Sequence, residues 1–264
     1  MSLVHPLVLP ITKHDEDTKT RNTAKTGKSD HTHLKVDSKM TTKEYKPMDL
    51  RDYVIRKSQQ RSRDFSHHQI RALEKLGKRP DDIIYGAHID SGRIFQSKEF
   101  KRVIHAYMDI FNDFFFCGLL KLDLIFDDTT RETGLGNSTD LIEGAEIELS
   151  ADVKYQDRGK LLTSYQGVLL HEMIHCWFFF ACGLSPCDKE YERLDRLGVG
   201  GHGYLFHDVS ARLAIAARRV LGLTLVVATA EELENEYRKC GERLKREWYR
   251  PWYDSESAFY TCLT

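Results

Sequence analysis

KLLTSYQGVLLHEMIHCWFFFAC, residues 160–182, is the most apolar long stretch of the chain. An apolar run of this length favours a helix over a strand, because strands in globular proteins seldom exceed about ten residues. A helix that is apolar around most of its circumference belongs in the interior of a domain rather than on its surface. We therefore predict a buried helix over residues 160–182 and expect the other elements of the domain to pack around it.

Two more core-facing helices are predicted, one on each side of this segment. Large apolar side chains recur at three- and four-residue steps over residues 100–115, which is the period of one helical face. Cys117 and Gly118 follow this stripe and are predicted to end the helix. A similar stripe covers residues 206–220, and Gly222 is predicted to end it.

Strands are predicted where short apolar or alternating runs lie between turn residues. They are expected at residues 121–126, 145–150 and 223–227, with turns at Gly134, Gly136, Asn137 and Gly144. A charged helix is expected from residue 230 to about residue 250. The predicted fold class is therefore α+β, with a small sheet packed on helices that include residues 160–182.

The composition limits the class of protein. The 264 residues include 39 Lys and Arg against 40 Asp and Glu, and a net charge of −1 excludes a globally basic nucleic-acid-binding protein. No apolar run reaches the roughly 18 residues of a membrane helix, and the apolar residues 3–11 lack the basic start of a signal peptide. We therefore expect an intracellular protein with no membrane partner.

The cysteines are consistent with an intracellular location. Six are present, and none of them forms a CxxC pair. We expect mainly reduced, partly buried thiols. The alternative is an oxidising compartment, in which Cys182 and Cys187 would close a small loop.

Four regions are expected along the chain. Residues 1–48 contain almost no large apolar side chains after residue 11 and are predicted to form a disordered tail. Residues 49–96 are predicted to be a basic helical or linker segment, residues 97–230 the main domain, and residues 231–264 a helical extension.

The segment of residues 49–79 is locally basic, with nine Lys or Arg against four Asp or Glu. Such a face can contact phosphate groups, which makes DNA a candidate partner through this segment. A solvated helix or linker is the alternative explanation of the same charges. Within it, the run of residues 56–63 is compatible with nuclear import.

The predicted buried helix contains the motif His171-Glu-Met-Ile-His175. Residues four apart lie one turn above each other on a helix, so the two imidazoles can hold one cation. Glu172 then lies beside the ion, where it can accept a proton from water. Two imidazoles and a carboxylate would be costly to bury without a partner. We therefore predict a Zn²⁺ site, with Glu172 as the catalytic base.

A catalytic zinc normally takes three protein ligands. Phe178 and Ala181 occupy the positions at which the metzincin motif requires Gly and His, so that class is excluded. His202 is the preferred third ligand, because the glycines on both sides of it allow a tight turn toward the first helix. The alternatives are Glu190 and Glu192, and also His207, which fits better as an outer residue or a surface residue.

Four blocks of the sequence together resemble the SprT-like metallopeptidases, the family that includes the Spartan DNA–protein crosslink proteases. They are residues 111–119 (FNDFFFCGL), 145–150 (AEIELS) and 169–175 (LLHEMIH), and the segment Gly201-His-Gly-x-x-Phe206. The resemblance covers residues 97–230. It implies a zincin-like fold with zinc on His171, His175 and His202 and Glu172 as the general base. The cysteine-paired module that often follows in this family has no counterpart here, because Cys240 and Cys262 are isolated.

Three functions from different classes follow as hypotheses. The first is a zinc endopeptidase whose protein substrate adds a strand to the edge of residues 145–150. The second adds DNA as a partner, in DNA–protein crosslink repair. The third is a catalytically silent, zinc-stabilised scaffold that binds nucleic acid or protein.

Overall fold

The computed structural model describes residues 46–82, 84, 97–127, 136–141, 144–150, 158–182, 197–198 and 200–239. Most of the predicted tail at residues 1–48 and all of residues 240–264 lie outside this part. So do Glu190 and Glu192, and the predicted Cys182–Cys187 loop is not described either. The fold class is mixed α+β, as predicted.

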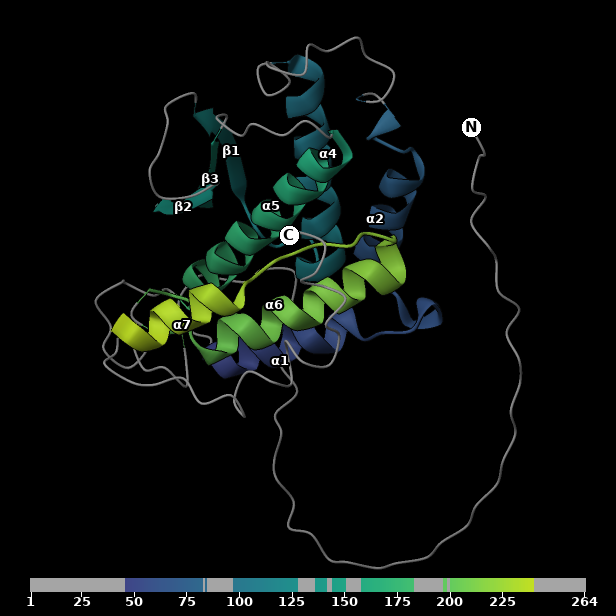
Figure 1. The fold of residues 1–264 in the computed structure, drawn as a ribbon. Helices are drawn as coiled ribbons and strands as arrows, with labels where there is room; N and C mark the ends of the chain where they lie inside the picture. Colours follow the sequence, from purple (N-terminus) through teal and green to yellow (C-terminus); the bar gives the residue numbers. More distant parts are fainter. Residues whose placement is uncertain are drawn as a thin grey trace, which may run out of the picture. The chain divides into compact units, whose positions relative to one another are not determined.

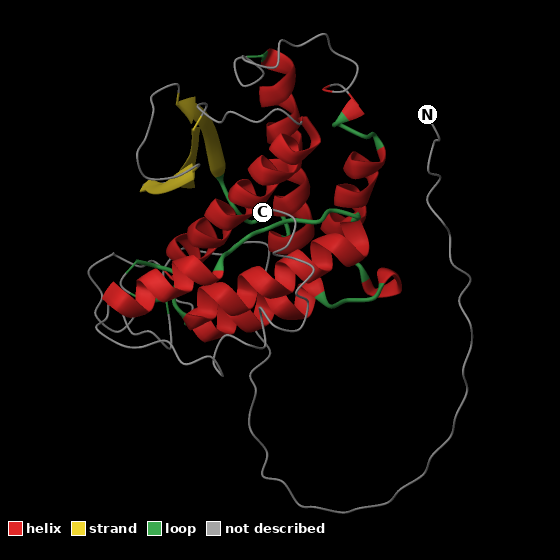
Figure 2. Ribbon diagram, viewed as in Figure 1, coloured by secondary structure: helices red, strands yellow, loops and turns green. Residues whose placement is uncertain are grey.

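Six α-helices and three strands occur in the described ranges (Figure 1, Figure 2). The helices are α1 (Pro47–Ser58), α2 (His67–Gly77), α4 (Lys98–Phe116), α5 (Arg158–Cys182), α6 (Tyr204–Ala216) and α7 (Ala230–Lys239). The strands are β1 (Leu122–Asp127), β2 (Gly136–Leu141) and β3 (Gly144–Ser150). A 3-10 turn, η1 (Ser62–Asp64), follows α1, and a π-helical turn, η3 (Ala217–Leu221), extends α6.

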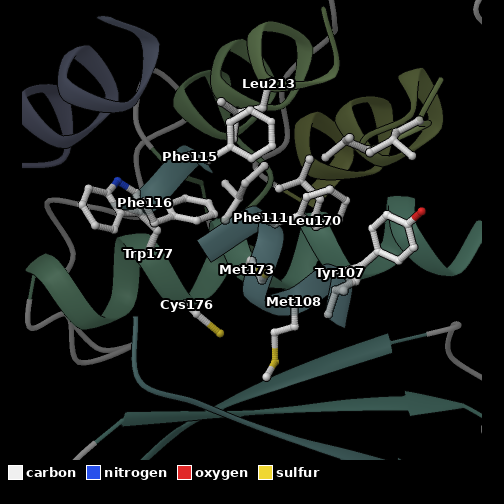
Figure 3. Packing of buried hydrophobic residues seen from close by; sticks show 14 of the residues in the cluster. Tyr107, Met108, Phe111, Phe115, Phe116, Leu170, Met173, Cys176, Trp177 and Leu213 are labelled. Atoms are coloured by element: carbon white, nitrogen blue, oxygen red, sulfur yellow. The ribbon is translucent and has the colours of Figure 1, made fainter. Parts of the chain in front are cut away.

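Helix α5 is the predicted buried helix, and it packs against α1, α4, α6, β2 and β3. Its apolar side chains meet the aromatic face of α4 in one core. Phe116 lies against Trp177 with ring centroids 5.5 Å apart, and both side chains are fully buried. Figure 3 shows these two rings side by side, Phe115 next to Leu213 of α6, and Met108 and Cys176 directed toward the sheet. Burial of each such side chain stabilises the fold by about 1.5–3 kcal/mol.

Helix α4 ends where the sequence predicts, and its start is capped by a serine. The Ser97 hydroxyl caps it by accepting the backbone N–H of Phe100 at 3.0 Å. It ends at Cys117, which adopts the left-handed conformation with φ of 55°. Asn112 then bonds both the N–H and the C=O of Leu120, which fixes the turn into β1.

The sheet has the order β1-β3-β2, in which β3 is parallel to β1 and antiparallel to β2. Our expectation of a free edge at residues 145–150 is therefore wrong, because β3 is the central strand and is paired on both sides. Within the described strands, β2 pairs on one side only, and it packs against α5. The exposed edge beside the motif helix is that of β2.

Gly136 and Asn137, predicted to form a turn, instead begin strand β2. The physical reason is a close approach between the strand and α5. A Cβ at position 136 would lie 2.6 Å from Val168 Cγ1, so only glycine lets the strand reach the helix. The glycine therefore marks packing rather than chain reversal.

The strand predicted at residues 223–227 is also wrong, because residues 222–229 form neither helix nor strand. This segment lies against α5 instead of against another strand. A Cβ on Gly167 of α5 would be 2.3 Å from the carbonyl oxygen of Val226, so the backbones are in direct contact there. Leu225 and Val227 are buried, which accounts for the apolar pattern.

Helices α1 and α2 contribute to the same core through Leu50, Val54 and Ala72. Several of their basic side chains bind carboxylates on neighbouring helices. Arg71 and Lys75 of α2 pair with the buried Asp113 of α4. Burial opposes ionisation of Asp113, but hydrogen bonds from Arg71, Lys75 and His68 outweigh it and lower its pKa to about 2.

Two further sequence expectations concern the described residues. Cys117 and Cys176 are reduced rather than disulfide-bonded, as predicted. Within the described ranges, none of the helices combines the length and the apolar character needed to cross a membrane.

Candidate metal centre

The structure brings His171, His175 and His202 together. The Nε2 atoms of His171 and His175 are 3.2 Å apart, and that of His202 lies 3.1 Å from each of them. The first two side chains share one face of α5 because they are four residues apart. The third comes from the loop that precedes α6. Three ring nitrogens thus converge on one point, which is the arrangement of a metal site.

The spacing of these nitrogens fits a tetrahedral zinc ion. At a Zn–N distance of about 2.0–2.1 Å, tetrahedral geometry separates two ligand nitrogens by about 3.3 Å. The observed separations of 3.1–3.2 Å are close to this value. Among the described residues, no fourth His, Cys, Asp or Glu joins this group, so they leave a fourth position of a tetrahedral ion open.

The protonation of the imidazoles also suits a cation. His171 Nδ1 lies 2.7 Å from the carbonyl oxygen of Val227, and this contact orients the ring with Nε2 toward the other two imidazoles. Burial, together with the neighbouring His171, lowers the pKa of His202 to about 4 and that of His175 well below its ordinary value. Neutral rings whose lone pairs face one another repel, and a cation between them removes that repulsion.

The loop that carries His202 depends on two glycines that precede it. Gly198 and Gly201 have positive φ angles of 76° and 81°, which L-residues rarely adopt. A Cβ at position 201 would lie 3.2 Å from Cε1 of His175, so the turn also passes close to the second imidazole. The predicted tight turn is therefore present.

Glu236 of α7 packs against this loop and accepts a hydrogen bond from its backbone. Its side chain is 1% exposed, and Oε1 accepts the backbone N–H of Gly200 at 2.7 Å. A Cβ at position 198 or 200 would lie within 2.4–2.5 Å of the Glu236 carboxylate, so the loop and the carboxylate are closely packed. The sequence alone does not reveal this residue, because its partner is a backbone group 36 positions away.

The ring of Phe206 packs against all three imidazoles. Its ring centroid lies 4.8 Å from that of His171, 4.4 Å from that of His175 and 4.9 Å from that of His202. The side chain is fully buried and belongs to the first turn of α6. Packing against one rigid ring restricts the rotamers of all three histidines, which favours a preformed site.

His207 was the competing ligand on α6, and it lies outside the histidine cluster. It is 1% exposed, so the surface role considered for it does not apply. Its ring hydrogen-bonds the backbone of His202, and burial lowers its pKa to about 3. It therefore lies outside the ligand set and supports the loop that carries His202.

Glu172 follows the first histidine on α5 and is 6% exposed. Burial raises its pKa, while His171 and a hydrogen bond from Ser138 of β2 act in the opposite direction. A Cβ on Gly136 would be 3.1 Å from Glu172 Oε1, so β2 passes directly beside the carboxylate.

A cleft of about 620 Å³ opens over these groups. One wall is β2, with Gly136, Asn137 and Ser138, and the other is the segment Val226–Thr229 with Glu232. Three successive residues of β2 line the cleft, so a chain bound there would lie beside a strand edge. Of the described residues that line it, the charged ones are the two carboxylates Glu172 and Glu232, besides the histidines.

Comparison of the chain with protein-family models, with curated proteins and with solved structures finds no match in any of the three. The geometry of the site therefore carries the functional argument.

We predict that Glu236→Ala weakens zinc binding about 10- to 100-fold, the usual effect of removing an outer residue that orients a ligand. The loss of the carboxylate frees the N–H of Gly200 and loosens the loop that presents His202. Glu236→Gln keeps an acceptor oxygen and is expected to stay within a few-fold of the wild type. Competition against a chromophoric chelator measures both affinities.

The matched control is Glu234→Ala, because Glu234 lies on the same helix with its side chain 56% exposed and paired with Arg238. It should bind zinc as the wild type does. Wild-type affinity in Glu236→Ala would contradict the positioning role.

Proposed function

We propose that the protein is a zinc-dependent endopeptidase with a zincin-like domain of the SprT type. The observation that carries the proposal is the convergence of three histidine Nε2 atoms at 3.1–3.2 Å beside a buried glutamate. Neither feature alone would suffice, because structural zinc sites also use histidines. A structural site would fill the fourth position with another protein ligand.

His171, His175 and His202 would hold the ion. Zinc bound there supplies polarisation of a substrate carbonyl and brings the pKa of water toward 7. Glu172 accepts the proton of the attacking water and then delivers it to the leaving amine.

The substrate would lie along β2. The strand pairs on one side only among the described strands, and its residues Gly136, Asn137 and Ser138 line the cleft. A peptide added to this edge forms main-chain hydrogen bonds and places a peptide bond beside Glu172. The proposed substrate is thus an extended protein segment, and the edge is that of β2 rather than the one first expected at β3.

The test is metal analysis combined with a protease assay on the full chain. We expect about one zinc per chain, loss of peptide hydrolysis after chelation, and recovery when zinc is added back. An unfolded protein substrate such as casein serves as the probe. Hydrolysis that survives metal removal would contradict the zinc mechanism.

A metal-loaded chain that never cleaves, with and without DNA, would instead support the scaffold hypothesis. Stimulation of cleavage by DNA would support a place in DNA–protein crosslink repair, which we propose on the resemblance.

A further inference from the structure

A second cavity, of about 750 Å³, lies on α1, η1 and α6 and shares no lining residue with the metal cleft. Its charged lining is dominated by five arginines: Arg51, Arg56, Arg61, Arg63 and Arg212. Two carboxylates, Asp52 and Asp64, also line it. The cavity therefore carries an excess of positive charge, although the chain as a whole has a net charge of −1.

Arg51 is held in a fixed position by a buried carboxylate. Arg51 Nε donates to Oδ2 of Asp208 at 2.6 Å, and the Asp208 carboxylate is 3% exposed. Arg212 lies 3.5 Å from the same carboxylate on the other side. Asp208 is buried and does not line the cavity, but it positions the two arginine side chains that do.

The remaining arginines have weak partners or none among the described residues. Arg63 lies 3.7 Å from Asp64, and both side chains are more than half exposed, so that pair contributes little. Arg56 and Arg61 form no ion pair with any described residue. Guanidinium groups gathered around a concave surface repel one another unless an anion lies between them.

The end of α1 at this cavity is rigidly held. Gln69 of α2 donates to the carbonyl of Lys57 at 3.1 Å, and Arg219 donates to that of Ser58 at 2.8 Å. These bonds occupy the last carbonyls of the helix, whose partial negative charge would otherwise disfavour an anion nearby. A preformed cavity loses less conformational entropy when a ligand binds.

We propose that this arginine-lined cavity binds phosphate groups. Arginine presents a planar fork of N–H donors that matches phosphate oxygens in pairs, and it stays charged at any physiological pH. Two sources share this chemistry, namely free phosphate and the backbone of a nucleic acid. The basic side chains of residues 49–79 therefore have two roles. Arg71 and Lys75 pair with a carboxylate on a neighbouring helix, whereas others line this cavity together with Arg212 of α6.

The experiment measures binding of inorganic phosphate by calorimetry and of a fluorescent single-stranded 12-mer oligonucleotide by anisotropy. The full chain is compared with the Arg56→Ala/Arg61→Ala double variant at equal salt. We expect the double variant to bind the phosphate-bearing probe about tenfold more weakly or worse. For the oligonucleotide, the slope of log K against log salt should fall by about 0.7 for each phosphate group that an arginine no longer neutralises.

The matched control is the double variant Arg79→Ala/Arg238→Ala, which removes the same charge from exposed positions outside the cavity. It should bind within twofold of the wild type. Binding of phosphate alone assigns the site to a small anion, and binding of the oligonucleotide assigns it to a nucleic-acid backbone.

Two outcomes would overturn the proposal. One is no binding of either probe at low salt. The other is an equal loss of binding in both double variants, which would reflect net charge rather than the cavity. Zinc content should be the same in all these proteins, so the result is independent of the proposed peptidase function.

Discussion

Glu172→Gln is expected to abolish peptide hydrolysis and leave the bound zinc in place. The amide has nearly the shape of the carboxylate and can still bond Ser138, but it cannot take a proton from water. Loss of a general base typically lowers the rate about 10²- to 10⁴-fold. Hydrolysis of a quenched fluorescent peptide gives the rate, and metal analysis of the same sample gives the zinc content.

The matched control is Glu74→Gln, an exposed position on α2. It should hydrolyse the peptide at the wild-type rate. If Glu172→Gln cleaved at that rate with zinc bound, Glu172 would have no part in the reaction. If it lost both zinc and activity, its main role would be to maintain the site.

The parts of the fold that follow from local periodicity could be predicted from the sequence. Helices α4, α5 and α6 carry long apolar stripes, and the two histidines of the motif lie on one face because four residues make about one helical turn. The approach of His202 could also be anticipated from the glycines around it in the sequence, although only those that precede it, Gly198 and Gly201, adopt a positive φ. These inferences need only the spacing of residues along the chain.

The errors arise where distant segments meet. Gly136 has the sequence pattern of a turn residue, but its small size serves the packing of β2 on Val168. The apolar residues 223–227 have the pattern of a strand, but their backbone lies against Gly167 of α5. In both cases a contact between segments far apart in the sequence determines the local structure, and no local pattern records that contact.

The supporting residues of the site escape prediction for the same reason. Glu236 acts on a backbone N–H, and Val227 acts through its own backbone carbonyl, so neither has a side-chain signature for metal binding. Phe206 resembles any other core aromatic until its ring is found under all three imidazoles. The sequence reveals the groups that carry the chemistry more readily than those that position them.

His202→Ala is expected to weaken zinc binding by more than the roughly 100-fold expected when an outer residue is lost, and to abolish hydrolysis. The remaining pair, His171 and His175, comes from one helix face and leaves two coordination positions to water. A second readout is thermal unfolding. Zinc that binds only the folded chain raises the wild-type midpoint, and this shift should disappear in the variant.

Two comparisons make this result decisive. His67→Ala removes an exposed imidazole from α2 and should retain both zinc binding and the thermal shift. Glu190→Gln and Glu192→Gln test the alternative third ligands and should bind zinc as the wild type does. If His202→Ala kept wild-type affinity while one of the glutamine variants lost it, the third ligand would be that glutamate. The loop that Glu236 hydrogen-bonds would then contribute to packing and not to metal binding, because the imidazole of His202 that it carries would not be needed to bind zinc.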